Sequence, residues 1–280
     1  MKIAVFTVML PNYSPIQALD VLHKAGYNGV EWRVTKLNPA LTRETPSFWG
    51  NNLATIDTSS TSQQLADLRE ETSRRGLVAT NLGSYLQVGD LEGVDRDMRI
   101  AQALGSPSIR VGVPMYDRTH TYGELLAKGR AYLSGVQSLS QHYGIKGLIE
   151  THMGNIAASA SGARRLVEGF NPAHIGVIHD AGNMVYEGFE NYRMGLEILG
   201  EYLGHVHIKN ARWVLDKDSN GVKWRAESAP LREGSAELKQ LLADLRAVGY
   251  DGWLSFEDFS DPAPTQASLA TNLAYLKNLI

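Results

Sequence analysis

The sequence of 280 residues contains no cysteine. Disulfide bonds, thiolate nucleophiles, zinc–cysteine sites and iron–sulfur clusters are therefore excluded, and the composition fits a reducing compartment. Long apolar runs are missing as well. The run within Met1–Pro15 is too short to span a bilayer and lacks the small-residue cleavage site of a signal peptide. We therefore expect a cytoplasmic protein without a membrane partner.

An excess of charge of either sign is also absent. The chain has 27 Lys and Arg against 30 Asp and Glu, which gives a formal net charge of −3. This balance argues against a nucleic-acid partner. The apolar share of 43% argues against wholesale disorder. A chain of this length can form one large domain with a sizeable core.

The chain repeats one pattern, in which a short apolar or β-branched run is followed by a loop and then by an amphipathic helical stretch. We expect strands at Lys2–Thr7, Gly29–Val34, Leu77–Leu82, Ser108–Val113, Lys146–Thr151, Ile175–Asp180, Val206–Lys209 and Gly252–Glu257. We expect helices at Ser14–Ala25, Ser60–Arg75, Leu91–Leu104, Tyr122–Tyr143, Ala158–Glu168, Tyr192–Leu203, Ser235–Val248 and Thr265–Leu279.

Eight such units predict an α/β fold with a parallel sheet closed into a (β/α)8 TIM barrel, as one domain over residues 1–280. An open doubly wound sheet is the alternative, but no glycine-rich phosphate loop follows the first strand, where the sequence is Thr7–Pro11. We expect the two longest connections, Thr35–Ser59 and Asn210–Gly234, to be irregular and to lie over the end of the barrel where active sites form.

Four consecutive predicted strands place an acid or an imidazole at or near their ends: Glu150, Asp180, His207 and Glu257. In a barrel these ends converge on one mouth. Three carboxylates in one mouth would raise each other's pKa unless a cation lay between them. Hard oxygens with one imidazole suit a single divalent ion, Mn²⁺, Co²⁺, Mg²⁺ or Zn²⁺, of which we favour Mn²⁺.

Other residues near the mouth are candidates for substrate contact. His152 shares a strand face with Glu150 and is a candidate base or donor. Glu31 either pairs with Arg33 or contacts substrate. Arg110 is expected to pair with Glu31 or Glu150. Lys209 and Arg212 either bind a sugar hydroxyl, carboxylate or phosphate, or are solvated loop charges. His205 is interpreted as a packed, hydrogen-bonded residue rather than a ligand.

Several segments together resemble the sugar phosphate isomerase/epimerase superfamily with its xylose isomerase-like TIM barrel. They are Gly26–Glu31, Glu150–His152, Asp180–Asn183, His205–Lys209 and Gly249–Trp253, which leads to Glu257. The resemblance implies that Glu150, Asp180, His207 and Glu257 are the metal ligands. It also implies that the two glutamates form an acid/base pair on opposite sides of the substrate.

Two departures from that pattern matter. Asn183 stands where the ketose 3-epimerases of the superfamily carry a histidine, and we expect it to contact substrate. His152 stands at a position that resembles the dehydratase and carbon-glycoside-cleaving lyase branches. The apurinic endonuclease branch, with its three zinc ions, and xylose isomerase, with its second metal site, fit poorly because the extra histidines and carboxylates are lacking.

The sequence thus predicts a divalent-metal-dependent isomerase or epimerase that acts on a keto-sugar or related polyol by proton transfer through an enediolate. The catalytic candidates are Glu150, Glu257 and His152. One alternative is a metal-dependent lyase or dehydratase, including one that cleaves a 3-keto-glycoside or carbon-glycoside. A further alternative is a non-catalytic barrel that binds sugar or metal. The expected partner is a small carbohydrate, and by analogy with this superfamily a homodimer is also an expectation.

Overall fold

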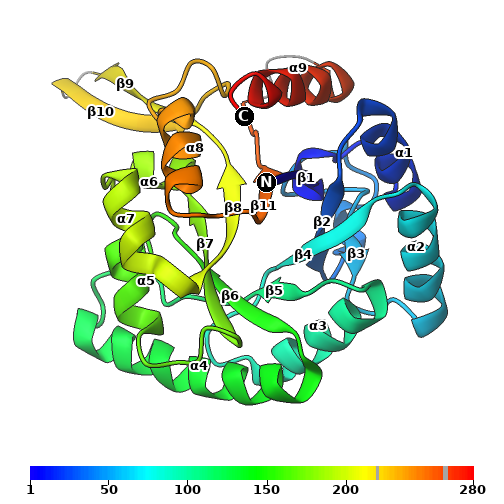
Figure 1. Ribbon diagram of the computed structural model, residues 1–280, viewed down its shortest axis with the longest axis horizontal. Helices are drawn as coiled ribbons and strands as arrows, with labels where there is room; N and C mark the ends of the chain where they lie inside the picture. Colours follow the sequence, from blue (N-terminus) through cyan, green and yellow to red (C-terminus); the bar gives the residue numbers. More distant parts are fainter. Residues whose placement is uncertain (219–220, 261–263) are drawn as a thin grey trace.

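A computed structural model describes residues 1–218, 221–260 and 264–280. Its central feature is a ring of parallel strands with helices on the outside (Figure 1). The strands of the ring are β1 (Lys2–Phe6), β2 (Gly29–Thr35), β4 (Val78–Ser84), β5 (Ser108–Arg110), β6 (Lys146–Glu150), β7 (Ile175–Asp180), β8 (Leu203–Ile208) and β11 (Trp253–Phe256).

The order of pairing closes this ring. It runs β1-β11-β8-β7-β6-β5-β4-β2, and β2 pairs again with β1. Closure leaves none of these eight strands as an edge, which suits their apolar sequences. The closed parallel barrel confirms the predicted (β/α)8 fold.

Helices separate the strands along the chain and cover the barrel. They are α1 (Pro15–Ala25), α2 (Ser62–Arg74), α3 (Leu91–Leu104), α4 (Tyr122–Tyr143), α5 (Ala160–Val167), α7 (Tyr192–Leu199), α8 (Leu238–Ala247) and α9 (Thr265–Lys277). Local chemistry sets their ends. Ser14 and Gln17 form a capping box at the start of α1, and Gly26 ends that helix with a φ of +85°, a conformation that glycine adopts without strain.

The prediction that Asn210–Gly234 is irregular was wrong. Most of the segment forms an antiparallel hairpin of β9 (Ala211–Asp218) and β10 (Gly221–Ser228), in which Leu215 pairs with Trp224. Apolar and polar side chains alternate along β10 from Val222 to Glu227, which is the pattern of a strand with two unlike faces. The other long connection, Thr35–Ser59, holds the 3-10 turn η2 (Pro39–Leu41) and the short β3 (Ile56–Asp57).

The predicted helix Tyr192–Leu203 was too long. The helix α7 ends at Leu199, the turn η3 (Gly200–Tyr202) follows, and β8 begins at Leu203 rather than at Val206. The apolar side chain of Leu203 continues the helical pattern, although it belongs to the strand. A short helix that the pattern did not predict, α6 (Ala181–Tyr186), begins directly after β7.

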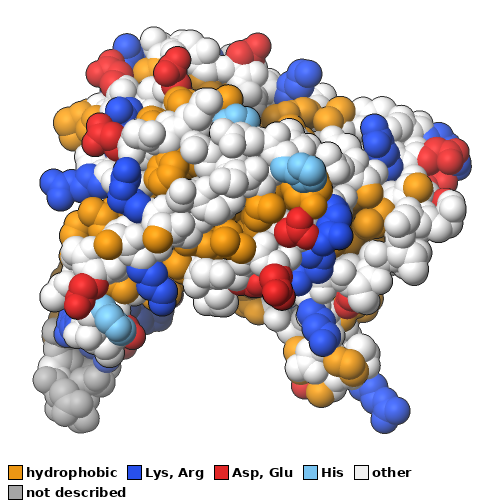
Figure 2. Space-filling view, turned by 90° about the horizontal axis from the view of Figure 1, so that it is seen from below, with side chains coloured by type: hydrophobic (Ala, Val, Ile, Leu, Met, Phe, Trp, Pro, Cys, Tyr) orange, Lys and Arg blue, Asp and Glu red, His pale blue; other side chains and the backbone are white. Residues whose placement is uncertain are grey.

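Both long connections start at the carboxyl ends of parallel strands, so they extend the molecule on the same side of the barrel. Figure 2 shows two arms that project from one side of the body with a recess between them. Among the described residues, no helix combines the length and the apolar composition that a membrane span requires.

The barrel interior is closely packed beneath this recess. The side chain of Phe6 is fully buried, and its ring lies parallel to that of His207 with 6.0 Å between the ring centres. Gly83 of β4 faces the same ring, because a Cβ atom at this position would lie only 2.2 Å from Cζ of Phe6. The absence of a side chain at Gly83 therefore allows Phe6 to support the mouth from below.

We predict that Gly83→Ala lowers the free energy of unfolding by about 1–3 kcal/mol, the usual effect of overpacking a core. The added methyl group would collide with the ring of Phe6, which would have to move. Denaturation in urea measures the change. Gly123→Ala is the matched control, because Gly123 lies in α4 with no neighbouring atom within 4 Å of the added carbon. Equal stabilities of the two variants would mean that Phe6 has room to move.

Candidate active site

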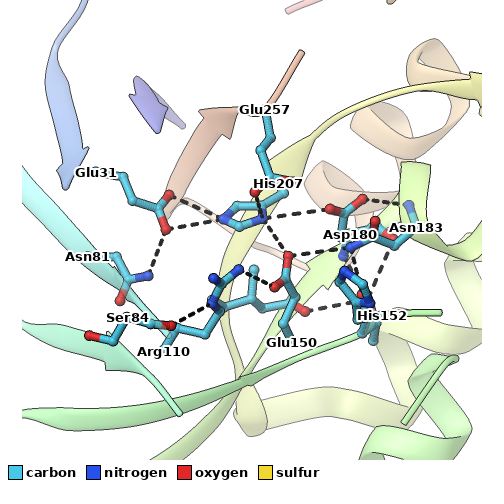
Figure 3. A network of polar contacts seen from close by, with 12 residues as sticks. Glu31, Asn81, Ser84, Arg110, Glu150, His152, Asp180, Asn183, His207 and Glu257 are labelled. Atoms are coloured by element: carbon cyan, nitrogen blue, oxygen red, sulfur yellow. Dashed lines mark hydrogen bonds and ion pairs between the residues drawn. The ribbon is translucent and has the colours of Figure 1, made fainter. Parts of the chain in front are cut away.

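The four predicted metal ligands meet at the carboxyl-terminal mouth of the barrel (Figure 3). Glu150 ends β6, Asp180 ends β7, His207 lies near the end of β8, and Glu257 follows β11. Each is at most 5% exposed. One potential ligand atom from each residue lies within 4.8 Å of the corresponding atoms of the others.

The Nδ1 atom of His207 is the point on which the three carboxylates converge. It lies 2.9 Å from Glu150 Oε1, 3.7 Å from Asp180 Oδ2 and 3.9 Å from Glu257 Oε1. The parallel register brings this about in part, because Asp180 of β7 pairs directly with His207 of β8. The four donors thus surround a small volume at the barrel axis.

The other ring nitrogen of His207 faces Glu31 of β2. Nε2 lies 3.2 Å from each oxygen of Glu31, which also contacts His205 Nε2 at 3.1 Å and accepts a hydrogen bond from Asn81. A carboxylate behind one nitrogen of a ligating histidine fixes the ring and its tautomer. With a proton on Nε2, the lone pair of His207 is on Nδ1, toward the three carboxylates.

The electrostatics of this histidine reflect its acidic surroundings. Burial alone would lower the pKa of His207, but Glu31, Glu257 and Glu150 together raise it well above its usual value. Burial would raise the pKa of Glu31, which the two histidines instead hold well below its usual value. Without a metal ion, His207 therefore supplies part of the positive charge that these carboxylates require.

Arg110 pairs with the oxygen of Glu150 that His207 does not contact. Its Nη1 lies 2.6 Å from Glu150 Oε2, while Glu150 Oε1 contacts His207 and, at 3.4 Å, Asn183 Nδ2. Burial would raise the pKa of Glu150, but Arg110 and His207 outweigh it and keep the pKa below its usual value. Both oxygens of Glu150 are therefore engaged by donors.

The pKa of Glu257 shifts in the opposite direction to the pKa of Glu150. Burial raises its pKa above the usual value, although Lys209 and His207 act in the opposite direction. Lys209 Nζ donates to Glu257 Oε2 and to Asn183 Oδ1, each at 2.8 Å. The pKa values of the two glutamates thus shift in opposite directions.

Asp180 offers an atom that fits a cation. Its Oδ1 accepts the backbone N–H of Asn183 at the start of α6, whereas Oδ2 is buried and has no hydrogen-bond partner. Lys209 Nζ is 3.8 Å from Oδ2. A buried carboxylate oxygen without a hydrogen bond is costly, and a divalent ion between it and Nδ1 of His207 would remove that cost. Three carboxylates and one imidazole therefore fit a divalent ion here.

A second group of potential ligands shares His207. The side chains of Glu31, His205 and His207 also come within 4.8 Å of one another. Their present contacts are hydrogen bonds between the two imidazoles and Glu31, and the group offers one carboxylate where the first offers three. A hard divalent ion favours oxygen, so the first group is the better site.

A cavity of about 350 Å³ opens beside the four candidate ligands, and we call it the catalytic lobe. The half-buried side chain of His152 lines this lobe. The Nδ1 atom of His152 donates to the carbonyl oxygen of Met153 at 2.8 Å. A carbonyl can only accept, so Nδ1 carries the proton and Nε2 the lone pair. The lobe is further lined by Phe48, Trp49, Tyr85, Arg110, Glu150, Met153, Tyr186, Lys209, Ser228, Glu257 and Phe259.

The structure brings some, but not all, of the candidate substrate contacts to this lobe. Arg110 and Lys209 line it. Asn183 is fully buried between Glu150 and Lys209, and Glu31 is fully buried on the far side of His207. Arg212 lies on β9 outside the lobe and pairs with Glu227 at 3.0 Å and Glu233 at 3.5 Å.

Several lining residues were not singled out from the sequence. Tyr85 directly follows β4, so its position after a strand end could have indicated it. Tyr186 comes from the unpredicted α6 and Ser228 from the end of the unpredicted hairpin, and no local signal marks either of them. Trp49 and Phe259 come from separate loops and meet with 4.8 Å between their ring centres.

Comparison with known proteins agrees with this architecture. An inosose dehydratase of Geobacillus thermodenitrificans is 27% identical over 165 residues, 54% of this chain and 53% of the relative. The chain thus matches about half the length of this curated relative.

Two solved structures match over almost their whole length. The IolI protein with a bound zinc atom has a TM-score of 0.75 at 17% identity, with 100% of this chain and 98% of that chain covered. The 3-keto-D-glucoside 4-epimerase YcjR of E. coli has a TM-score of 0.73 at 17% identity, with 99% of each chain covered. At these identities the likeness establishes the fold.

The family comparison tests the resemblance drawn from the sequence. A model of the family described as xylose isomerase-like TIM barrel matches residues 19–279. That match covers most of the chain and confirms the resemblance. The chain therefore belongs to the xylose isomerase-like TIM barrel family.

Proposed function

We propose that the chain is a divalent-metal-dependent enzyme that removes a proton next to the carbonyl group of a keto-sugar or keto-polyol. The oxygen substituent on the following carbon then leaves, so that the reaction is an elimination. The observation that carries this proposal is the convergence of Glu150, Asp180, His207 and Glu257 beside a cavity that also holds His152. The likeness to an inosose dehydratase supports elimination.

The ion would be held by Glu150, Asp180, His207 and Glu257. When bound, it would act as a Lewis acid that polarises the substrate carbonyl and makes the neighbouring proton more acidic. The oxygen-rich ligand set favours Mn²⁺, while the imidazole and the zinc in the IolI structure keep Zn²⁺ as an alternative.

Glu150 is best suited to holding the ion rather than to moving protons. Arg110 and His207 engage its two oxygens, and its pKa is held below the usual value. A weak base of this kind removes a carbon-bound proton slowly. This arrangement favours elimination over an exchange in which both glutamates alternate as acid and base.

His152 and Glu257 are the proposed proton carriers. His152 presents the Nε2 lone pair and takes the proton from carbon. Glu257 lines the same cavity and gives a proton to the departing oxygen, which leaves as water or as an alcohol. Lys209 steadies Glu257 and offers positive charge to a substrate oxygen. The electron pair of the broken C–H bond forms the new C=C bond as the C–O bond breaks.

Epimerisation is the second candidate function. It is favoured by the position of His152 and Glu257, which line one cavity from β6 and β11 and could serve opposite faces of a substrate. The likeness to a keto-glucoside epimerase supports it as well. The proton would then return to the same carbon, and no group would leave.

We predict that Mn²⁺ stabilises the chelator-treated protein by about 2.7 kcal/mol when the free ion exceeds its Kd about a hundredfold. Asp180→Asn should lose most of this stabilisation, because it removes the carboxylate charge while asparagine still caps α6. Thermal unfolding with and without Mn²⁺ measures both. Asp216→Asn, on β9, is the control and should respond like the parent. Equal stabilisation of all three proteins would refute this metal site.

We predict that the Mn²⁺-loaded enzyme eliminates water from an inosose, a ketone of inositol, with an enone as the first product. In heavy water, an eliminating enzyme yields product without that hydroxyl, whereas an epimerase returns deuterium to the carbon and keeps the hydroxyl. Nuclear magnetic resonance and mass spectrometry distinguish these results. Neither exchange nor elimination with inososes and a panel of ketoses would contradict both candidate functions.

Three variants test the assigned roles in the same assay. His152→Ala should lower turnover by roughly 10²–10⁴ while Mn²⁺ still binds, and Glu257→Gln should have a similar effect. His120→Ala, in the exposed loop after β5, is the control for histidine removal. Parent-like turnover of His152→Ala would contradict its role as base. A greater loss in Glu150→Gln, with Mn²⁺ verified as still bound, would restore Glu150 as a proton carrier.

A further inference from the structure

The short helix α6 lies between the candidate metal site and the hairpin of β9 and β10. Its first turn is capped by Asp180, whose Oδ1 accepts the backbone N–H of Asn183 at 2.8 Å. The side chain of Asn183 donates to Glu150 Oε1 at 3.4 Å and accepts from Lys209 Nζ at 2.8 Å. The beginning of α6 is therefore bound directly to two of the candidate metal ligands, Asp180 and Glu150.

The last turn of α6 is held by the hairpin. The indole N–H of Trp213, on β9, donates to the carbonyl oxygen of Val185 at 2.9 Å. The hydroxyl groups of Tyr186, which ends α6, and of Ser228, which ends β10, lie 3.4 Å apart. Carbonyl groups in the last turn of a helix have no partner within the helix, so an outside donor fixes where that turn lies. Trp213 supplies this donor from the hairpin.

Close packing joins the two ends of α6 into one unit. The residues Ala181–Val185 are buried. Gly182 lies against the main chain that leads from β8 into β9, because a Cβ atom at this position would be 2.8 Å from the carbonyl carbon of Lys209. A helix of six residues is only about 9 Å long. A displacement at one end of α6 therefore moves the other end as well.

A bound ion would change the contacts at one end of this helix. Asp180 uses Oδ1 for the cap of α6, whereas its buried Oδ2 has no hydrogen bond and is the oxygen that it offers to the ion. The ion would hold the second oxygen of the same carboxylate and so fix the cap. A ligand can bias a second site only through a contact that differs between two states, and this carboxylate supplies such a contact.

We propose that binding of the divalent ion is coupled through α6 to the β9–β10 hairpin, and that Trp213 is a positioning residue for the candidate ligand Asp180. The inference rests on the proposed metal site but not on the proposed reaction. Such coupling is reciprocal, so the ion holds the hairpin and the hydrogen bond of Trp213 strengthens binding of the ion. Because Ser228 lines the catalytic lobe, that wall of the lobe is fixed when the ion is bound.

The substitution Trp213→Phe tests the effect of the hairpin on the ion. It keeps an aromatic ring and removes the N–H donor, and it should weaken Mn²⁺ binding by about fivefold, the lower end of the usual range for coupled sites. Calorimetry on the chelator-treated full chain measures the Kd. Trp224→Phe is the matched control and should bind Mn²⁺ like the parent. Trp224 lies on the same face of the hairpin, is 64% exposed, and makes no hydrogen bond through its indole to the described residues.

Hydrogen–deuterium exchange in the parent tests the effect of the ion on the hairpin and does not depend on the folding of any variant. Mn²⁺ should slow the exchange of amides in β9 and β10 by about the same fivefold factor. Amides of α2, which lies on the opposite side of the barrel from the hairpin (Figure 1), should exchange at an unchanged rate. In Trp213→Phe the slowing in the hairpin should be lost, whereas Trp224→Phe should keep it.

Equal Mn²⁺ affinities of Trp213→Phe and the parent, or hairpin exchange that the ion does not slow, would overturn the inference. A purely structural role of Trp213 would give the first of these results, with a loss of stability in the chelator-treated variant.

Failure of the coupling is distinct from failure of the proposed function. An ion that binds the parent and supports turnover without either effect would overturn the coupling alone. A parent chain that binds no Mn²⁺ would overturn the metal site and the coupling together. Both effects without turnover of any keto-sugar would support the coupling and contradict the proposed reaction.

Discussion

His207 lies between one carboxylate on one side and three on the other, and the arrangement of the mouth depends on this position. Glu31 holds its Nε2 from one side, while Glu150, Asp180 and Glu257 surround its Nδ1 on the other. Carboxylates removed from water are stable only when cations or donors pair with them. Arg110, Lys209 and His207 supply that pairing in part, and Asp180 Oδ2, which has no hydrogen bond, marks where more positive charge fits.

The barrel accounts for this concentration of charge. Each ligand comes from the end of a different strand, so four acidic or basic side chains can approach one point. The ring of Phe6 closes the space beneath His207, and Gly83 leaves room for that ring. The fold therefore excludes water from below the candidate metal site and leaves access from the mouth.

The opposite pKa shifts of Glu150 and Glu257 bear on the reaction that the site could carry out. Arg110 and His207 hold the pKa of Glu150 below its usual value, whereas burial raises the pKa of Glu257. His152 is a further group at the cavity with a free lone pair. In the proposed reaction Glu150 holds the ion, while His152 takes a proton from carbon and Glu257 gives one to a departing oxygen.

The barrel and the position of the four candidate ligands could be predicted from the sequence because both follow from local patterns. Apolar runs ending in Glu150, Asp180 and Glu257 mark strand ends, and strand ends of one barrel converge. The role of Glu31 could not be predicted in this way. Its contact with His207 joins residues 176 positions apart, and the local sequence equally allowed a pair with Arg33.

The hairpin of β9 and β10 shows a different limit. Its strands are outside the barrel, so the repeating strand–helix pattern did not include them. The dipeptide Asn220–Gly221, which is typical of tight hairpin turns, and the alternation of apolar and polar residues around Trp224 were the available signals. Because the hairpin was taken as a loop, the ion pairs that hold Arg212 on β9 could not be foreseen.

Anomalous X-ray diffraction from crystals soaked in Mn²⁺ tests the central claim most directly, because it locates the ion without reference to activity. The account predicts one strong peak within bonding distance of Nδ1 of His207 and of oxygens of Glu150, Asp180 and Glu257. A peak among Glu31, His205 and Nε2 of His207 instead, or no peak at the mouth with the ion in excess, would contradict it.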